Sequence, residues 1–335
     1  MKHLPVHALM FLKITKPIIL QTGLLLACLA ACATPLPSPP VTKTADILSV
    51  AALQTALGRN GFGAGFVDGK DGPRTYNAFR DYRKATGLSD RRAREALLSN
   101  NIPATLTYTL TQSDLSRVGS APTDWQAASE VHSMAFESLD EALSEKFHVS
   151  KPFLQRLNPG ITNWDSELLG VQITVPNSQS DLTPLSAARI EVDCTAYRLR
   201  VFGTDDNLLA SFPCSIARDQ ARVPTGELCI ASFAPNPNYT FDPANFPESA
   251  RAREIGRKLI LPPGPNNPVG VYWITLNAPG FGIHGTPHPE TIGRRESHGC
   301  FRLTNWDIVT LAAMVQVGTP VLIVGVPTPA PPPPE

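Results

Sequence analysis

Two short stretches, His284-Gly285-Thr286 and Ser297-His298-Gly299-Cys300-Phe301-Arg302, decide how this chain is interpreted. They combine a thiol, two imidazoles, a guanidinium and glycines that let the backbone approach a ligand closely. A free cysteine has a pKa of about 8.5 and is mostly protonated at neutral pH, so an attacking cysteine needs an imidazole and positive charge nearby. The pattern therefore predicts a cysteine-nucleophile site in which Cys300 supplies the sulfur.

The words around this site resemble a known family. Ile283-His284-Gly285-Thr286, the run from Ser297 to Leu303, and Gly318-Thr319-Pro320-Val321 resemble the catalytic domain of bacterial L,D-transpeptidases of the YkuD type, which cross-link peptidoglycan. Upstream, the Pro/Gly-rich segment 262–270 followed by Tyr272-Trp273-Ile274 resembles the loop and strand before the histidine in multi-domain members. The resemblance covers residues 187–326.

The resemblance implies a role for each residue of the motif. Cys300 would attack the carbonyl between diaminopimelate at position three and D-Ala at position four of a peptidoglycan stem, with His284 as base and proton donor. The Gly285 carbonyl would orient the imidazole. His298 and Gly299 would form an oxyanion hole and contact the substrate. Ser297 would support the loop, and Arg302 would stabilise the thiolate or a substrate carboxylate.

Two other interpretations of these residues are weaker. Cys300 could be a buried structural thiol and the histidines ordinary core residues, but their joint occurrence at this spacing argues against it. His284, His288, His298 and Cys300 could also offer zinc ligands. His288 lies between two prolines and the spacing is unlike that of catalytic zinc sites, so we expect no metal and no cofactor.

The acyl acceptor stays open at this point. An amine of a second stem would give a 3-3 cross-link, and a lysine of an outer-membrane protein would give attachment to the wall. Water would make the protein an L,D-carboxypeptidase, and a free D-amino acid would give exchange. An alternative from another class is a non-catalytic wall-tethering lipoprotein.

Length and composition bound these possibilities. The 335 residues suffice for two or three domains, and the formal net charge is zero. Basic residues form no long run, so the chain lacks the electrostatic signature of a nucleic-acid-binding protein. Several of the 33 prolines cluster at 35–40 and 327–334, which predicts an extended tether and tail at 32–45 and 327–335.

The amino terminus resembles a bacterial lipoprotein signal at residues 1–31. Lysines precede an apolar run at 17–31, and Leu29-Ala30-Ala31-Cys32 resembles a lipobox, which implies cleavage before Cys32 and acylation of its thiol. Met10 is a possible true start, and ordinary secretion is the alternative. Ala33 after Cys32 resembles cargo sorted to the outer membrane, so we expect a lipid-anchored periplasmic protein of the cell envelope.

Two accessory modules are expected between tether and catalytic domain. Residues 46–100 show helical spacing of apolar residues around a glycine-rich loop, and they resemble a three-helix peptidoglycan-binding domain, with Arg83 where that family commonly has Gln. Residues 126–177 resemble a degenerate LysM glycan-binding module without its usual opening Gly-Asp-Thr. For each module, a spacer without glycan affinity is the alternative.

The expected fold class is multi-domain α+β, with a mainly-β, sandwich- or barrel-like catalytic domain after the three-helix domain and the small LysM-like α/β module. Alternation and turn residues predict strands at 190–202, 208–216, 227–233, 270–276 and 320–326. Thr304 is expected to cap one helix whose buried face contains Ile308, Leu311, Ala312 and Val315. A hairpin about the turn 203–206 would place Cys194 opposite Cys214, which suggests a disulfide; three inert buried thiols, including Cys229, are the alternative.

Overall fold

The computed structural model of the protein describes residues 47–99, 102–120, 122–180, 185–297 and 299–326. The expected signal peptide, the acylated Cys32, the tether and the tail lie outside these ranges, as does His298, so the expectations about them stay predictions. Within the described ranges, no helix is both long enough and apolar enough to cross a membrane.

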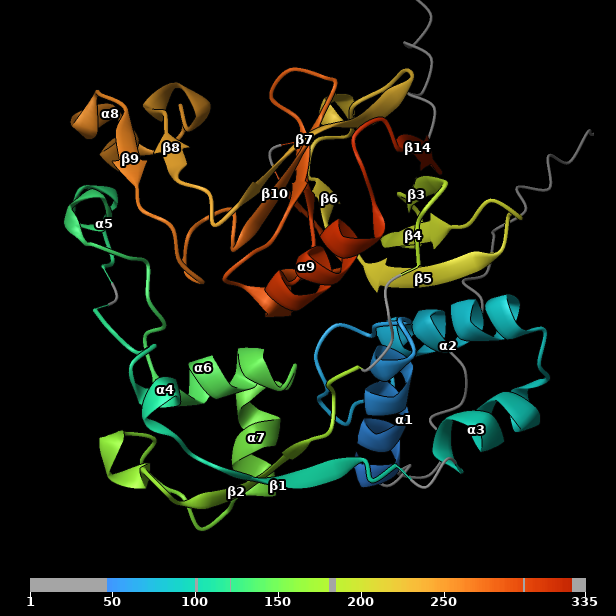
Figure 1. Ribbon diagram of the computed structural model, residues 1–335. Coiled ribbons are helices and arrows are strands. Elements are labelled where there is room, and N and C mark those ends of the chain that lie inside the picture. Colours follow the sequence, from blue (N-terminus) through green and yellow to red (C-terminus); the bar gives the residue numbers. More distant parts are fainter. Residues whose placement is uncertain (1–46, 100–101, 121, 181–184, 298, 327–335) are drawn as a thin grey trace, which may run out of the picture. The chain divides into compact units, whose positions relative to one another are not determined.

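The amino-terminal part contains three helices, as the apolar spacing predicts (Figure 1): α1 (Ile47–Arg59), α2 (Pro73–Thr86) and α3 (Asp90–Leu98). Pro73 begins α2, where its missing N–H costs no hydrogen bond, and Gly87 ends that helix in the left-handed conformation. Leu57, Ala78 and Leu97 join the three helices in one core, which also includes Phe202 and Leu208 of the carboxy-terminal part.

A single side chain of α1 organises the glycine-rich loop between the first two helices. Gln54 Nε2 donates to Asp68 Oδ1 at 2.8 Å and to Thr75 Oγ1 at 3.0 Å, and Gln54 Oε1 accepts from the amides of Asp68 and Gly69. Gly69 has a φ of +67°, as expected of the Asp-Gly turn. The loop is therefore fixed from both sides by one buried amide.

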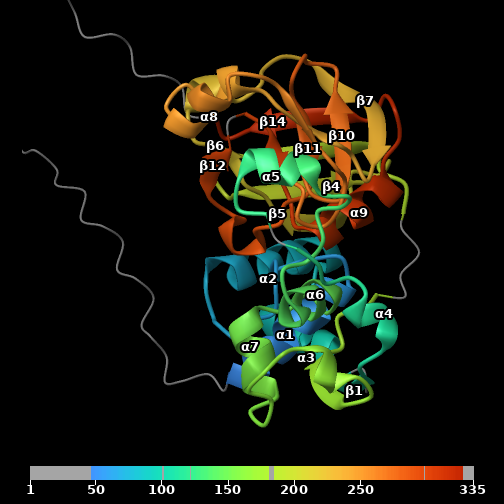
Figure 2. The same ribbon diagram turned by 90° about the vertical axis from the view of Figure 1, so that its left-hand side faces the viewer.

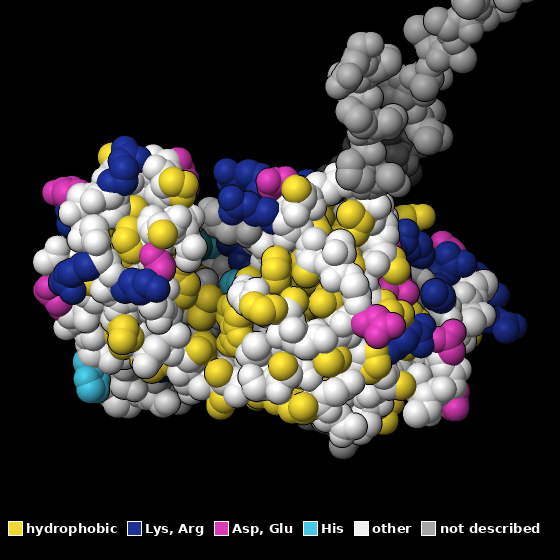
Figure 3. Space-filling model, turned by 90° about the horizontal axis from the view of Figure 1, so that it is seen from above, with side chains coloured by type: hydrophobic (Ala, Val, Ile, Leu, Met, Phe, Trp, Pro, Cys, Tyr) yellow, Lys and Arg dark blue, Asp and Glu magenta, His cyan; other side chains and the backbone are white. Residues whose placement is uncertain are grey.

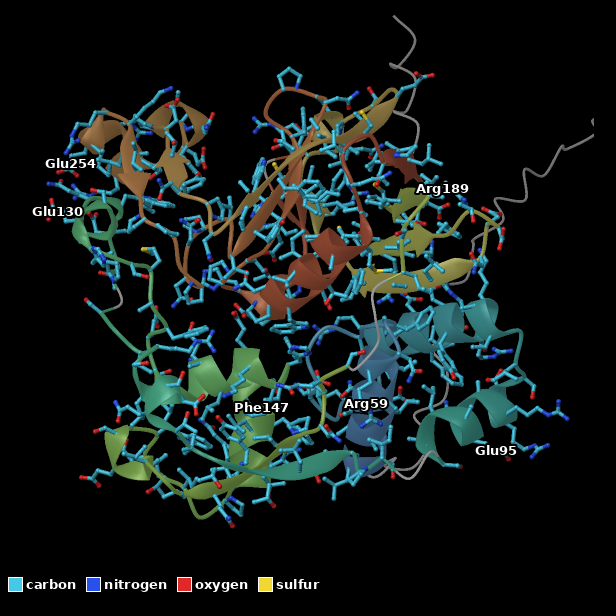
Figure 4. All side chains as sticks on the ribbon, viewed as in Figure 1. Arg59, Glu95, Glu130, Phe147, Arg189 and Glu254 are labelled. Carbon is cyan, nitrogen blue, oxygen red and sulfur yellow. The ribbon has the colours of Figure 1, made fainter. Side chains whose placement is uncertain are left out.

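The middle part is a two-stranded sheet covered by short helices. The elements are β1 (Thr105–Thr109), α4 (Gln112–Leu115), α6 (Leu139–Lys146), α7 (Lys151–Leu157) and β2 (Gln172–Pro176). The strands pair antiparallel, with Thr107 opposite Thr174. Phe147, labelled in Figure 4, is buried in the core of this part. The Asn158 side chain, which follows α7, donates to the Thr174 carbonyl and accepts from the Thr174 amide.

The expected boundaries 126–177 do not coincide with this unit. The partner of β2 is β1, which begins at Thr105, upstream of the expected start. Helix α5 (Trp125–Glu130), which begins one residue before the expected range, packs instead against a lobe of the carboxy-terminal part. The alternation of β1 is mostly between threonines and gives little apolar signal, and a LysM identity for the unit stays a prediction.

The carboxy-terminal part is β-rich, as expected, and is built on one mixed sheet of eight strands. Their order is β13-β11-β10-β7-β14-β3-β4-β5. The bounds are β3 (Arg189–Asp193), β4 (Arg198–Phe202), β5 (Leu208–Pro213), β7 (Leu228–Pro235), β10 (Tyr272–Leu276), β11 (Gly282–His284), β13 (Phe301–Arg302) and β14 (Pro320–Val324). A further short pair joins β6 (Ile216–Ala217) to β12 (Arg295–Ser297). A single half-barrel sheet, rather than a sandwich of two sheets, therefore forms this region.

Helix α9 (Asn305–Met314) covers the core face of the sheet, and its start is the predicted one. The Thr304 hydroxyl accepts from the amide of Asp307, and Ile308 and Leu311 are fully buried among the sheet's apolar side chains. Figure 1 shows α9 lying along β10.

The expected strand at 190–202 and the expected disulfide were wrong. The chain turns between β3 and β4, where Tyr197 has a φ of +52°, so these residues form a hairpin rather than one strand. Cys194 lies in that turn, and β4 pairs with β5 so that Arg198, not Cys194, faces Pro213. Among the described residues, Cys194, Cys214, Cys229 and Cys300 are all free thiols.

A lobe is inserted between β7 and β10. It contains β8 (Tyr239–Phe241), α8 (Ala250–Ile255) and β9 (Leu259–Leu261), and none of these short elements was expected. Helix α5 packs on it: the Trp125 ring stacks on Phe241 at 4.6 Å, and Arg251 Nε lies 2.7 Å from Asp124 Oδ2. Figure 1 shows α5 next to β9 of this lobe, and Figure 2 shows the lobe and α5 from the side.

A buried ion cluster joins α2 to the sheet. Asp81 on α2 contacts the Nε atoms of Arg198 at 3.3 Å and of Arg200 at 3.2 Å, and its side chain is 2% exposed. Arg198 also donates to the Gly63 carbonyl at 2.7 Å, and Arg200 donates to Asp193 at 2.9 Å. Removing one member of such a cluster leaves an uncompensated buried charge.

We expect Asp81→Ala to lower the free energy of unfolding by about 3–5 kcal/mol, because two buried guanidinium groups lose their shared carboxylate. Urea denaturation followed by circular dichroism measures the change. The matched control is Arg91→Ala, which removes an exposed pair with Glu95 and should cost under about 1 kcal/mol. A cost for Asp81→Ala as small as that of the control would contradict this assignment.

Candidate active site

The parallel pairing of β11 with β13 brings the two sequence motifs together. Ile283 is in register with Phe301, and His284 with Arg302. Ile283 and Phe301 are fully buried in the core. Side chains alternate along a strand, so His284 and Arg302 lie on the opposite face, and alternation directs Cys300, one residue before β13, to that face too.

The His284 ring is fixed from two sides. Its Nδ1 lies 2.6 Å from the Gly285 carbonyl oxygen, the contact that the motif implied. Trp273, its register partner on β10, stacks on the ring with centroids 5.2 Å apart and planes 13° apart. Because a carbonyl can only accept, Nδ1 carries the proton in the neutral ring and Nε2 is left as the acceptor.

Burial makes both candidate reacting groups prefer their neutral forms. Burial, together with the positive charge of Arg302, lowers the pKa of His284 to about 4, although hydrogen bonds to the backbone of Gly285 and Val269 favour the imidazolium. Burial also raises the pKa of the Cys300 thiol, although a backbone hydrogen bond from Gly282 and the charge of Arg302 oppose this. The Cys300 sulfur lies 3.6 Å from the Gly280 carbonyl oxygen, a contact that suits a thiol donor.

The free site therefore differs from the thiolate that the sequence suggested. Both the thiol and the imidazole are expected to be neutral at rest: at Cys300 desolvation outweighs the charge of Arg302, and at His284 desolvation and that charge act in the same direction. The proton would then move to the imidazole when the sulfur attacks, as in serine–histidine sites.

Arg302 is the cation of the site and has an unused donor. Its Nε is buried and has no hydrogen-bond partner among the described residues. Burial lowers the pKa of this guanidinium, while negative charge at Glu296 and Cys300 raises it. An anion formed at the sulfur or on a substrate would satisfy both the charge and the buried N–H.

The turn before Cys300 is closed by Ser297. The amide of Gly299 donates to the Ser297 hydroxyl at 3.2 Å, so this predicted oxyanion donor is engaged in the free protein. A Cβ at residue 299 would lie 3.0 Å from the Phe281 ring, which explains the glycine. His298 lies outside the described residues.

Comparison with known proteins shows what this region resembles. Residues 187–323 match the family model of the L,D-transpeptidase catalytic domain, YkuD. The chain is 29% identical over 184 residues to the putative L,D-transpeptidase YkuD of Bacillus licheniformis, covering 55% of this chain and 92% of that protein. It is 30% identical over 191 residues to the probable L,D-transpeptidase YcfS of Escherichia coli, covering 56% of this chain and 59% of that protein.

These matches support a YkuD-type L,D-transpeptidase catalytic domain in residues 187–323. Among solved structures, the chain resembles an L,D-transpeptidase from Mycobacterium smegmatis at 20% identity with a TM-score of 0.32, covering 47% of this chain and 64% of that one. The family assignment rests on the sequence matches.

Two aromatic residues of the L,D-transpeptidase domain were missed by reasoning from sequence. Trp273 was noticed only as part of a strand, although its place opposite the His284 strand decides the stacking. Tyr239, on the inserted lobe, is near enough to Cys300 for a thiolate to raise its pKa, after the larger effect of burial. Lobe and sheet meet only in the tertiary structure, so no local signal identifies Tyr239.

Asn305 joins the catalytic turn to its surroundings. Its Oδ1 accepts from the amide of Val271 at 3.2 Å, and its Nδ2 donates to Glu145 of α6 at 2.8 Å. A Cβ at Gly270 or Gly285 would collide with Oδ1, so both positions require glycine. Asn305 was expected only as part of a helix start.

His288 lies apart from the reacting groups, in an exposed loop where its Nδ1 is 3.6 Å from Glu290. In the ranges the structure describes, no three His, Cys, Asp or Glu side chains gather as a metal site would require. Figure 3 shows histidine side chains deep in a hollow of the surface, with basic side chains at its edge.

We expect alkylation of Cys300 by iodoacetamide to show no plateau between about pH 5 and 8 and to rise only above the ordinary thiol pKa of about 8.5. The reason is that burial raises the thiol pKa and lowers that of His284, so no stable ion pair forms between them. Peptide mapping after timed exposure gives the rate at each pH. A plateau of fast alkylation near pH 6 would show a pre-formed thiolate–imidazolium pair and contradict this electrostatic account.

Proposed function

We propose that the protein is a peptidoglycan L,D-transpeptidase with Cys300 as nucleophile and His284 as general base and acid. The observation that carries the proposal is the register between β11 and β13, from which we infer that His284, Arg302 and Cys300 lie on one face of the paired strands. The family match of residues 187–323 supports the reaction class.

The first half-reaction forms a thioester. His284 Nε2 takes the thiol proton as the sulfur bonds to the carbonyl carbon between diaminopimelate at position three and D-Ala at position four. The tetrahedral oxyanion collapses, the bond to nitrogen breaks, and the imidazolium returns its proton to the leaving D-Ala amine.

In the second half-reaction an acceptor amine attacks the thioester carbonyl. The amine loses a proton to His284, the bond between carbon and sulfur breaks, and the sulfur recovers a proton from the imidazolium. A second stem as acceptor gives a 3-3 cross-link, and a lysine of an outer-membrane protein gives attachment to the wall; water would give carboxypeptidase activity.

The remaining side chains have supporting roles in this proposal. Arg302 stabilises negative charge on the sulfur or on a substrate carboxylate, because its buried Nε has no partner in the described residues. Backbone amides at residues 298–300 receive the oxyanion, and for Gly299 this requires release from Ser297. Trp273 and the Gly285 carbonyl hold the imidazole in one tautomer.

We also propose that the protein acts in the cell envelope, held to the membrane by a lipid at Cys32. The lipobox-like residues before Cys32 and the proline-rich tether after it support this. The helices α1–α3 and the unit containing β1 and β2 would hold the catalytic domain on the glycan.

The test of the reaction is incubation of the full-length protein with disaccharide-tetrapeptide muropeptides and mass analysis of the products. We expect D-Ala release together with dimers, and loss of both in Cys300→Ala. Cys300→Ala should keep the fold, because it removes only the reacting sulfur of a half-buried side chain.

Other products decide between the alternatives. D-Ala release without dimers indicates a carboxypeptidase, and products that appear only with an added lysine-containing protein indicate wall attachment. A folded, reduced protein that neither turns over muropeptides nor forms a Cys300 adduct with meropenem would overturn the enzymatic proposal in favour of a wall tether.

A further inference from the structure

A groove outside the reacting groups is formed by all three parts of the described chain. It has a volume of about 880 Å³. One wall is the loop that carries Phe66 together with the first turn of α2, which carries Arg74. A second wall consists of helices α6 and α7, and the third is the segment 287–294 between the two sequence motifs. The groove therefore connects both accessory parts with the loop that leads to Cys300.

Arg74 is held in this groove by the glycine-rich loop. Its side chain carbon Cζ lies 4.4 Å above the Phe66 ring, and its Nη2 donates to Asp68 Oδ2 at 3.3 Å. Asp68 is itself held by Gln54. The bond to Asp68 is long, and within the described part of the chain it is the hydrogen bond of a guanidinium that has five N–H donors, so most of the Arg74 donors stay available.

A second guanidinium approaches from the catalytic domain. Gly293 packs on the aliphatic stem of Arg74, so that a Cβ there would lie 3.8 Å from Arg74 Cδ, and the next residue is Arg294. The positive charge of Arg294 lowers the pKa of Arg74, after the larger effect of burial. The acid nearest to Arg294 is Glu296 at 3.9 Å, a long contact at an exposed side chain.

Most acidic residues that line the groove already have a partner: Asp68 pairs with Arg74, and Glu290 lies 3.6 Å from His288. Glu145 accepts from Asn305 at 2.8 Å, and burial raises its pKa to about 7, so its charge is reduced. Glu141 accepts from the amide of Glu137 at 2.7 Å. Two cations that different domains hold side by side repel each other, and an added anion would relieve the repulsion.

We propose that Arg74 and Arg294 form a carboxylate-binding subsite that holds an acidic stem peptide of peptidoglycan in this groove. This inference rests on the proposed function. It names a second place, away from the reacting carbonyl, at which the protein holds the stem peptide. A carboxylate matches the fork of a guanidinium, and two arginines can bind both of its oxygens. Because the two arginines come from separate parts of the chain, the ligand would bridge the three-helix part and the catalytic domain.

The test is calorimetric binding of disaccharide-tripeptide to the full-length Cys300→Ala protein, which binds without turnover. We expect Arg294→Ala to weaken binding of the peptide about tenfold or more. Raised salt should weaken binding of the peptide to the protein in which both arginines are intact. Arg294 is 64% exposed, so this variant should fold, whereas Arg74→Ala removes a packed side chain. Arg74→Lys keeps the charge and should weaken binding less than Arg74→Ala.

A matched pair of ligands and a control variant separate this proposal from others. The same peptide with amidated carboxyl groups should bind weakly to every protein, with no further loss in Arg294→Ala. Arg91→Ala, an exposed arginine away from the groove, should bind as the parent does. Equal affinity of the parent and Arg294→Ala for the free acid would overturn the subsite, as would equal affinity for free and amidated peptides.

The proposed function fails by a different readout. It fails if protein with an intact Cys300 forms no meropenem adduct and releases no D-Ala, whatever the calorimetry shows. Binding that depends on Arg294 in such a protein would keep the subsite and assign it to a wall tether.

Discussion

The parallel pairing of β11 with β13 is the constraint on which the site depends. Burying Ile283 and Phe301 in the core turns the next residues, His284 and Arg302, to the other face. A slip of one residue in the pairing would turn the apolar side chains of a strand out of the core and the site residues into it. The free energy gained by burying the core therefore also fixes the positions of the site residues. The apolar residues within the two motifs are as necessary as the polar ones.

Both accessory parts are bonded to elements of the carboxy-terminal part. Asn305, which packs on the turn after His284, donates to Glu145 of the middle part, and Asp81 of the first part neutralises two arginines of β4. Helix α5 packs on the lobe that carries Tyr239. The contact of Asn305 reaches the turn beside His284, whereas β4 is separated from β11 by β10, β7, β14 and β3 in the sheet order.

The sequence predicted most of what is determined locally. The α9 cap at Thr304 and the turn after Phe202 each depend on residues within a few positions, and each is confirmed. The turn inside 190–202 was missed because apolar residues recur on both sides of it. Strands as short as β11 and β13 have no periodicity to detect.

Other features depend on contacts between distant residues. The stacking of Trp273 on His284, the approach of Tyr239 to Cys300 and the meeting of Arg74 with Gly293 join segments that no sequence spacing relates. The neutral state expected of Cys300 and His284 likewise depends on the folded structure. The motif contains the positive charge that favours a thiolate, but the burial that outweighs this charge is a property of the folded protein.

The central claim is that His284 takes the proton of Cys300 as the sulfur attacks. The most direct measurement is the rate of Cys300 acylation by meropenem, followed by intact mass, in the parent protein and in His284→Asn. A missing general base should lower this rate about 100-fold or more while the folded protein persists. Equal rates in the two proteins would contradict the account.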